Sequence, residues 1–86
     1  MANSPQTRLI NLLPACTVHT CQSSDWKSAS FSGQRFNLTL TPEDPNEFSQ
    51  KMATFDMDVT ISGWIICDVE ITHTQPVQLD ILLVEG

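Results

Sequence analysis

Several features that mark common classes of protein are missing from this 86-residue chain. It has no uninterrupted run of 18 apolar residues, which excludes a membrane-spanning helix. Only three glycines are present, and none belongs to a phosphate-cradling loop or to the serine-elbow motif of hydrolases. Cys67 falls at an inward position of an expected strand, where a thiol behaves as an inert hydrophobe. We therefore expect a protein that is not an enzyme.

Cysteine is also scarce, and its pattern argues against disulfides and metal sites. Three cysteines cannot pair completely within one chain. Along an extended strand, Cys16 and Cys21 would lie roughly 16 Å apart, far beyond the roughly 7 Å that a bridge tolerates. The apolar stretch 9–13 is shorter than the h-region of a signal peptide. We expect free thiols, a cytoplasmic location, and no metal or other cofactor, since no paired C-x-x-C motif occurs.

Positive charge is rare and unevenly placed. Residues 1–42 carry a net charge of +2, residues 43–86 carry −8, and the whole chain carries −6. The dense phosphate charge of nucleic acid would be repelled by such a chain, so direct nucleic-acid binding is not expected. A basic protein is the electrostatic complement and is therefore the expected partner.

The pattern of apolar residues predicts one β-rich α+β domain over residues 1–86. A short N-terminal helix begins at Ser4-Pro5 and ends at Pro14. A second helix follows Asp44, where proline and Glu47 complete a capping signal and Phe48 and Met52 form a buried stripe. Period-two alternation predicts five or six antiparallel strands, with this helix between the third and fourth, as a sheet or a small, partly closed barrel. The expected strands cover 16–21, 26–31, 35–41, 55–62, 65–72 and a final stretch from 77, with a turn at 22–25 and a hairpin loop at 32–34.

Matching the apolar faces of the last three strands predicts their register. This register pairs Asp58 with Asp68 and Asp56 with Glu70, and it sets Asp80 beside Glu70. Five carboxylates would then share one outward surface, although directly opposed like charges destabilise a sheet. We interpret the five as a partner-binding acidic surface; the alternative is that they only keep the protein soluble.

An apolar patch is expected on the same outward face, beyond the carboxylates. Trp64 is its best anchor for a partner, because aromatic residues dominate binding hot spots. Either the N-terminal helix covers this patch with its apolar side chains or the patch stays open as a docking surface. The patch consists of Trp64, Ile66, Leu82 and Val84, and the covering residues would be Leu9, Ile10, Leu12 and Leu13.

Three functions compete at this point. The favoured one is a small protein-binding module, such as an inhibitor encoded by a virus or a mobile element, that presents its acidic face to a basic, nucleic-acid-binding protein. The second is a structural or assembly protein that self-associates through a sheet edge and the Trp64 patch, which would make it a homo-oligomer. The third is a metal-binding domain, although calcium usually requires six or more oxygen ligands from a flexible loop.

Overall fold

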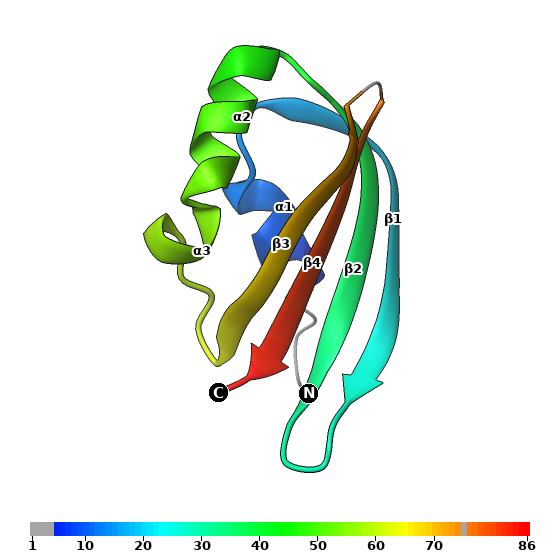
Figure 1. The fold of residues 1–86 in the computed structure, drawn as a ribbon, viewed down its shortest axis with the longest axis vertical. Helices are drawn as coiled ribbons and strands as arrows, with labels where there is room; N and C mark the ends of the chain where they lie inside the picture. Colours follow the sequence, from blue (N-terminus) through cyan, green and yellow to red (C-terminus); the bar gives the residue numbers. More distant parts are fainter. Residues whose placement is uncertain (1–4, 75) are drawn as a thin grey trace.

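The computed structural model describes residues 5–74 and 76–86, which form three helices and four strands (Figure 1). Their order along the chain is helix, two strands, two helices and two strands. The elements are α1 (Gln6–Leu12), β1 (Cys16–Lys27), β2 (Ser32–Pro42), α2 (Pro45–Ala53), α3 (Phe55–Asp58), β3 (Trp64–Thr74) and β4 (Val77–Glu85).

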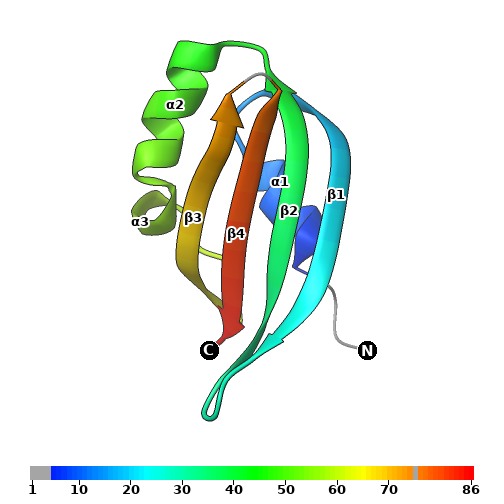
Figure 2. The same cartoon turned by 45° about the vertical axis from the view of Figure 1, so that its right-hand side comes forward.

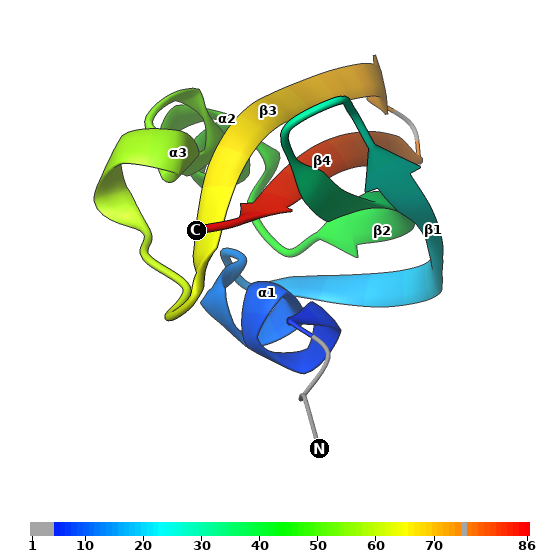
Figure 3. The same ribbon diagram turned by 90° about the horizontal axis from the view of Figure 1, so that it is seen from below.

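The four strands of the described chain make one antiparallel sheet in the order β1-β2-β4-β3. The predicted α+β class and the antiparallel sheet are confirmed, whereas five or six strands and partial closure into a barrel are not. All three helices lie on the same side of the sheet, as the views from the side and from below show (Figures 2 and 3). We call this side the covered face and the opposite side the open face.

The core lies between the covered face and the helices. In β2 the predicted alternation is confirmed, because Phe36, Leu38 and Leu40 are fully buried. The register places Leu79 and Ile81 of β4 beside them on the same face. Side chains from all three helices complete this core, since Leu9, Phe48 and Phe55 belong to the same buried cluster.

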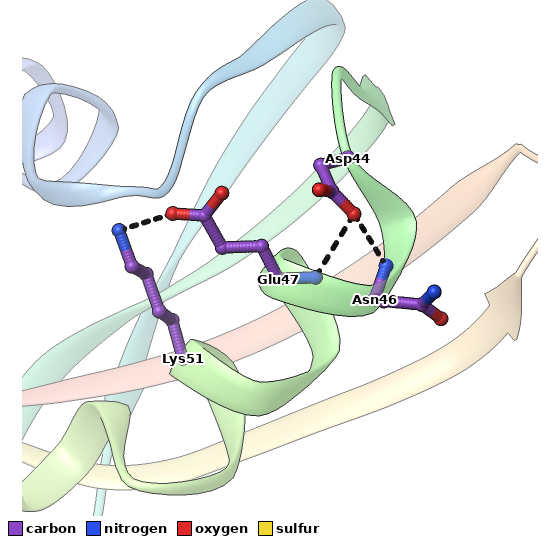
Figure 4. Close-up of polar contacts among 4 residues, drawn as sticks. All are labelled: Asp44, Asn46, Glu47 and Lys51. Carbon is purple, nitrogen blue, oxygen red and sulfur yellow. Dashed lines mark hydrogen bonds and ion pairs between the residues drawn. The ribbon is translucent and has the colours of Figure 1, made fainter.

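Helix α2 begins where the sequence predicts. The Oδ1 atom of Asp44 accepts hydrogen bonds from the backbone N–H groups of Asn46 and Glu47, both at 3.1 Å (Figure 4). These bonds satisfy two of the N–H groups that a helix start leaves unpaired. Pro45 occupies the first turn, and Phe48 and Met52 are buried as expected. The Glu47 carboxylate pairs with Lys51 at 2.8 Å, one turn along the helix.

Helix α1 is shorter than the predicted N-terminal helix. Its four apolar residues are also not all buried. It begins after Pro5, and Leu13 is already extended ahead of Pro14. Leu9 and Leu13 belong to the core, but Leu12 is 41% exposed. The expected capping residue, Ser4, lies outside the described residues.

Residues 16–27 form a single strand, so the predicted turn at 22–25 is wrong. Gln22 pairs with Asn37 and Asp25 pairs with Gln34, with no interruption between them. The predicted loop at 32–34 is also wrong, because the hairpin turns earlier. There the N–H of Ser28 donates to the Phe31 carbonyl at 2.8 Å, and the Phe31 N–H donates to the Ser28 hydroxyl at 3.1 Å. Residues 22–25 are polar but can remain extended, because β1 is an edge strand and their side chains stay exposed to solvent.

The predicted strand at 55–62 is wrong as well, because 55–58 is helical. The N–H of Val59 donates to the Phe55 carbonyl at 3.1 Å. Phe55 and Val59 are four residues apart and continue the stripe of Phe48 and Met52, so helical spacing fits the same apolar residues that alternate. Met57, expected on the inward face, is instead 74% exposed.

Candidate protein-binding surface

No helix of the described chain covers the open face of the sheet, so its side chains contact solvent or one another. The strand register arranges them in rows that run across the sheet. One end of the face is apolar, the centre carries three carboxylates and the cation of Arg35, and the other end carries uncharged polar residues and His73. The rows are Trp26–Gly33–Val84–Ile65, Ser24–Arg35–Leu82–Asp68, Gln22–Asn37–Asp80–Glu70 and Thr20–Thr39–Gln78–His73.

Three carboxylates share the centre of the open face, and we call Asp68, Glu70 and Asp80 the acidic patch. Glu70 pairs with Asp80 across β3 and β4, as the sequence predicted. Asp68 lies two residues before Glu70 on the same face, about 6.5–7 Å away along the strand. Asn37 Nδ2 donates a hydrogen bond to Asp80 Oδ1 at 3.1 Å. Within residues 5–74 and 76–86, the ion pair recorded is between Lys51 and Glu47, outside this patch.

The other two predicted acidic residues do not join this patch. Asp56 and Asp58 belong to α3, on the covered side of the sheet, and the Asp56 side chain is exposed there. The predicted pairs Asp58–Asp68 and Asp56–Glu70 are therefore wrong. Because they depended on a strand at 55–62, helix formation in that segment removes both pairs at once.

The apolar end of the open face has a different composition from the predicted patch. Leu82 and Val84 lie on this face as expected, and they are only 8% and 5% exposed although no helix covers them. Trp26 and Ile65 occupy the two ends of the row that contains Val84. Ile65 is 55% exposed. We call Trp26, Ile65, Leu82 and Val84 the apolar end.

Gly33 allows the backbones of β2 and β4 to approach each other closely in this row. A Cβ atom at Gly33 would lie 2.1 Å from the carbonyl oxygen of Leu83, so no larger residue fits without backbone movement. Trp26 is its direct partner on β1, and an aromatic side chain opposite a strand glycine compensates for the missing side chain. Part of the role of Trp26 is therefore structural.

Trp64 and Ile66 lie on the covered face, contrary to the prediction. Both are partly buried against the core cluster. The cause is a register shift between Ile66 and Asp68, which inserts Cys67 as an extra residue. Because a bulge adds one residue, every side chain on one side of it points to the opposite face of the sheet from the face that simple alternation predicts. Helix α1 also packs on the covered face, so it does not cover Leu82 and Val84.

The bulge exposes Cys67 on an edge strand, which corrects its expected place inside a central strand. Burial raises the pKa of the Cys16 and Cys21 thiols, and the charge of Glu43 adds to this effect at Cys16. His19 Nε2 lies 2.8 Å from the Thr41 hydroxyl. In the part of the chain that the structure describes, no group of three or more His, Cys, Asp or Glu residues is placed to hold a metal ion.

The covered side carries a largely apolar groove at its surface, between the end of α1 and the α2–α3 segment. Its volume is about 380 Å³, and its lining includes Leu12, Phe55 and Lys51. A smaller hollow of about 120 Å³ lies next to it, beside the carboxylates of Glu43 and Glu47. Carboxylates thus lie next to apolar side chains on both sides of the sheet, since Glu43, Asp44 and Glu47 all line the smaller hollow. The open face differs in that no helix of the described chain covers it.

Comparison with known proteins found no relative, since the chain matches no family model, no curated protein and no solved structure. Among the described residues, no helix has the length and apolarity needed to cross a membrane.

Proposed function

We propose that the chain is a small, non-enzymatic protein-binding module whose open face receives a basic, partly apolar segment of a protein partner. The observation that carries this proposal is the acidic patch beside the apolar end, on a face that no described helix covers. An apolar surface bordered by polar and charged residues is typical of interaction sites.

The two parts of this surface have different roles in the proposal. The apolar end supplies contact area, with Ile65 as its exposed member and Trp26 as its aromatic member. The acidic patch attracts and orients a segment rich in lysine or arginine, which raises the association rate and excludes acidic competitors. Such charge–charge contacts at an exposed surface weaken as salt concentration rises.

The spacing of the carboxylates supports the kind of partner that we propose. Opposed carboxylates lie about 5 Å apart and neighbours along a strand about 6.5–7 Å apart, which is comparable to phosphate spacing. Three carboxylates resemble only a short stretch of nucleic acid, however. A basic protein, including one that binds nucleic acid, is the partner class, and inhibition would follow from occupying its basic surface.

The experiment is capture of partners by the tagged protein, repeated with two matched variants. The first variant carries Asp68→Asn, Glu70→Gln and Asp80→Asn on the open face. The second carries three equivalent neutralisations of exposed carboxylates on the covered side, at Glu43, Glu47 and Asp56. Both variants change the net charge equally, so only the position of the charge differs.

We expect a basic protein to be captured by the unmodified chain and by the covered-side variant, and to be lost with the open-face variant. Raising the salt concentration should release it. Equal loss from both variants would show that total charge is sufficient. Equal retention would show that the acidic patch has no part in binding, and either result would refute the proposed site.

A further inference from the structure

The two edges of the sheet differ in how well they are protected against pairing with another strand. Edge strand β3 has register shifts at two places, between Ile66 and Asp68 and between Ile71 and His73. It also carries the charges of Asp68 and Glu70. Bulges and charges are the usual devices that keep an edge from pairing with a second chain.

Edge strand β1 has little such protection. It is 12 residues long, contains no proline, and carries no Asp, Glu, Lys or Arg from Thr17 to Ser24. Its register with β2 shifts once, near His19, and is then regular from Thr20 to Lys27. In Figures 1 and 2 no other element lies along its outer side. A long and regular edge with few charges is a template for strand pairing.

The hairpin geometry shows which residues of β1 direct their backbone groups outward. Hydrogen-bonded and non-hydrogen-bonded pairs alternate along an antiparallel ladder. Ser28 bonds to Phe31 at the turn, so the residues at 26, 24, 22 and 20 bond to β2. The intervening residues therefore present free N–H and C=O groups at the edge: Cys21, Ser23, Asp25 and Lys27.

We propose that a second copy of this chain occupies the β1 edge, antiparallel to the first, with Ser23 at the two-fold axis. This joins the two sheets into one continuous sheet. In this register the outward groups of Ser23 meet Ser23 of the second copy, and those of Cys21 meet Asp25 of the second copy. All paired residues then face the same side of the joint sheet, as strand pairing requires.

The low charge of the β1 edge allows a second copy of this acidic chain to occupy it. Each chain carries a net charge of −6, so two copies repel unless they meet where charge is low. The outward residues of β1 include one carboxylate, Asp25, and one ammonium, Lys27, and are neutral in sum. Centring on Ser23 keeps the two Asp25 side chains four residues apart, and the acidic patches lie on the distant strands β3 and β4.

Sedimentation of the full chain at increasing concentration tests this proposal. We expect the mass to rise from 9.6 kDa toward twice that value. Ser23→Lys places two like charges opposite each other at the axis and should return the protein to the monomer. Ser49→Lys, on the exposed face of α2, adds the same charge elsewhere and should leave the dimer intact.

A cross-link gives a second readout that does not depend on a weakened interface. With Cys16, Cys21 and Cys67 replaced by alanine, Ser23→Cys should form a disulfide-linked dimer on mild oxidation, because α-carbons in such a pair lie about 5.5 Å apart. Ser49→Cys in the same background should not form that dimer.

The proposal is overturned by a mass that stays at 9.6 kDa up to about millimolar concentration, which corresponds to an association weaker than about −4.1 kcal/mol. A dimer unaffected by Ser23→Lys overturns it equally. The dimer leaves the open face free, so neutralising the acidic patch should not lower the mass, and this separates the proposal from the one above.

Discussion

The two faces of the sheet bury apolar side chains in different ways. On the covered face, Phe36 and Leu79 are completely buried by helices that are distant in sequence. On the open face, Leu82 and Val84 are 8% and 5% exposed, yet no helix of the described chain covers them. Stability should therefore depend chiefly on the covered face, which leaves the open face available for binding.

The largest effect should come from the covered face. Phe36→Ala should lower the free energy of unfolding by about 3–5 kcal/mol, because it leaves a cavity in a fully packed core. Urea denaturation measures this change. Phe31→Ala at the hairpin tip, where the ring is 59% exposed, is the control and should change stability by about 0.5 kcal/mol or less. Equal effects would mean that the core is not where the structure places it.

A leucine pair compares the faces directly within β4. Leu82→Ala on the open face should cost about 2 kcal/mol, at the low end of the range for buried leucines, because water and neighbouring side chains can occupy the space. Leu79→Ala on the covered face is fully buried and should cost more, about 3–5 kcal/mol. If chemical denaturation gave the same loss for both, the difference between the faces would be refuted.

The free energy of unfolding should decrease at alkaline pH because of two partly buried thiols. Burial raises the pKa of Cys16 and Cys21 above the ordinary 9.0, so the folded chain holds these protons more tightly than the unfolded chain. Their contribution to stability is complete below about pH 9.0 and is lost as pH rises through the folded-state pKa values. Comparing unfolding at pH 8 and pH 10, the double variant Cys16→Ala/Cys21→Ala should lose less stability than the unmodified chain. An unchanged loss in the double variant would contradict this assignment.

The smallest effect concerns the acidic patch. Glu70→Gln removes one of two directly opposed carboxylates and should stabilise the fold by about 0.2–1 kcal/mol. High salt should reduce this gain because the pair is exposed. Thermal unfolding at low and high salt measures it, with Glu43→Gln as the control outside the patch. A loss of stability would indicate that Glu70 makes a favourable contact in the fold.

Features that depend only on residues close together in the sequence were predicted well. The Asp44 cap, the buried stripe of α2 and the alternation in β2 all follow from side chains within a few residues. The Glu70–Asp80 pair was also predicted, by matching the apolar faces of the last strands. The prediction that this pair binds a partner remains a proposal.

The failures that affected the candidate site arose where the same apolar residues fit more than one arrangement. Phe55 and Val59 fit both a strand and a helix, and packing beside Phe48 and Met52 selects the helix. The stretch 64–66 is apolar throughout and does not indicate which side faces inward. The bulge at Cys67 decides this, and it replaces Trp64 by Ile65 on the open face.

The sequence by itself determined the acidic charge, the capped second helix and the apolar strands of an α+β domain, because charge, capping and alternation are local properties. Only the tertiary structure decided which carboxylates gather and which aromatic residue lies on the same face of the sheet. Those outcomes depend on a bulge and on a helix–strand choice, each of which is settled by burial against residues far away in the chain.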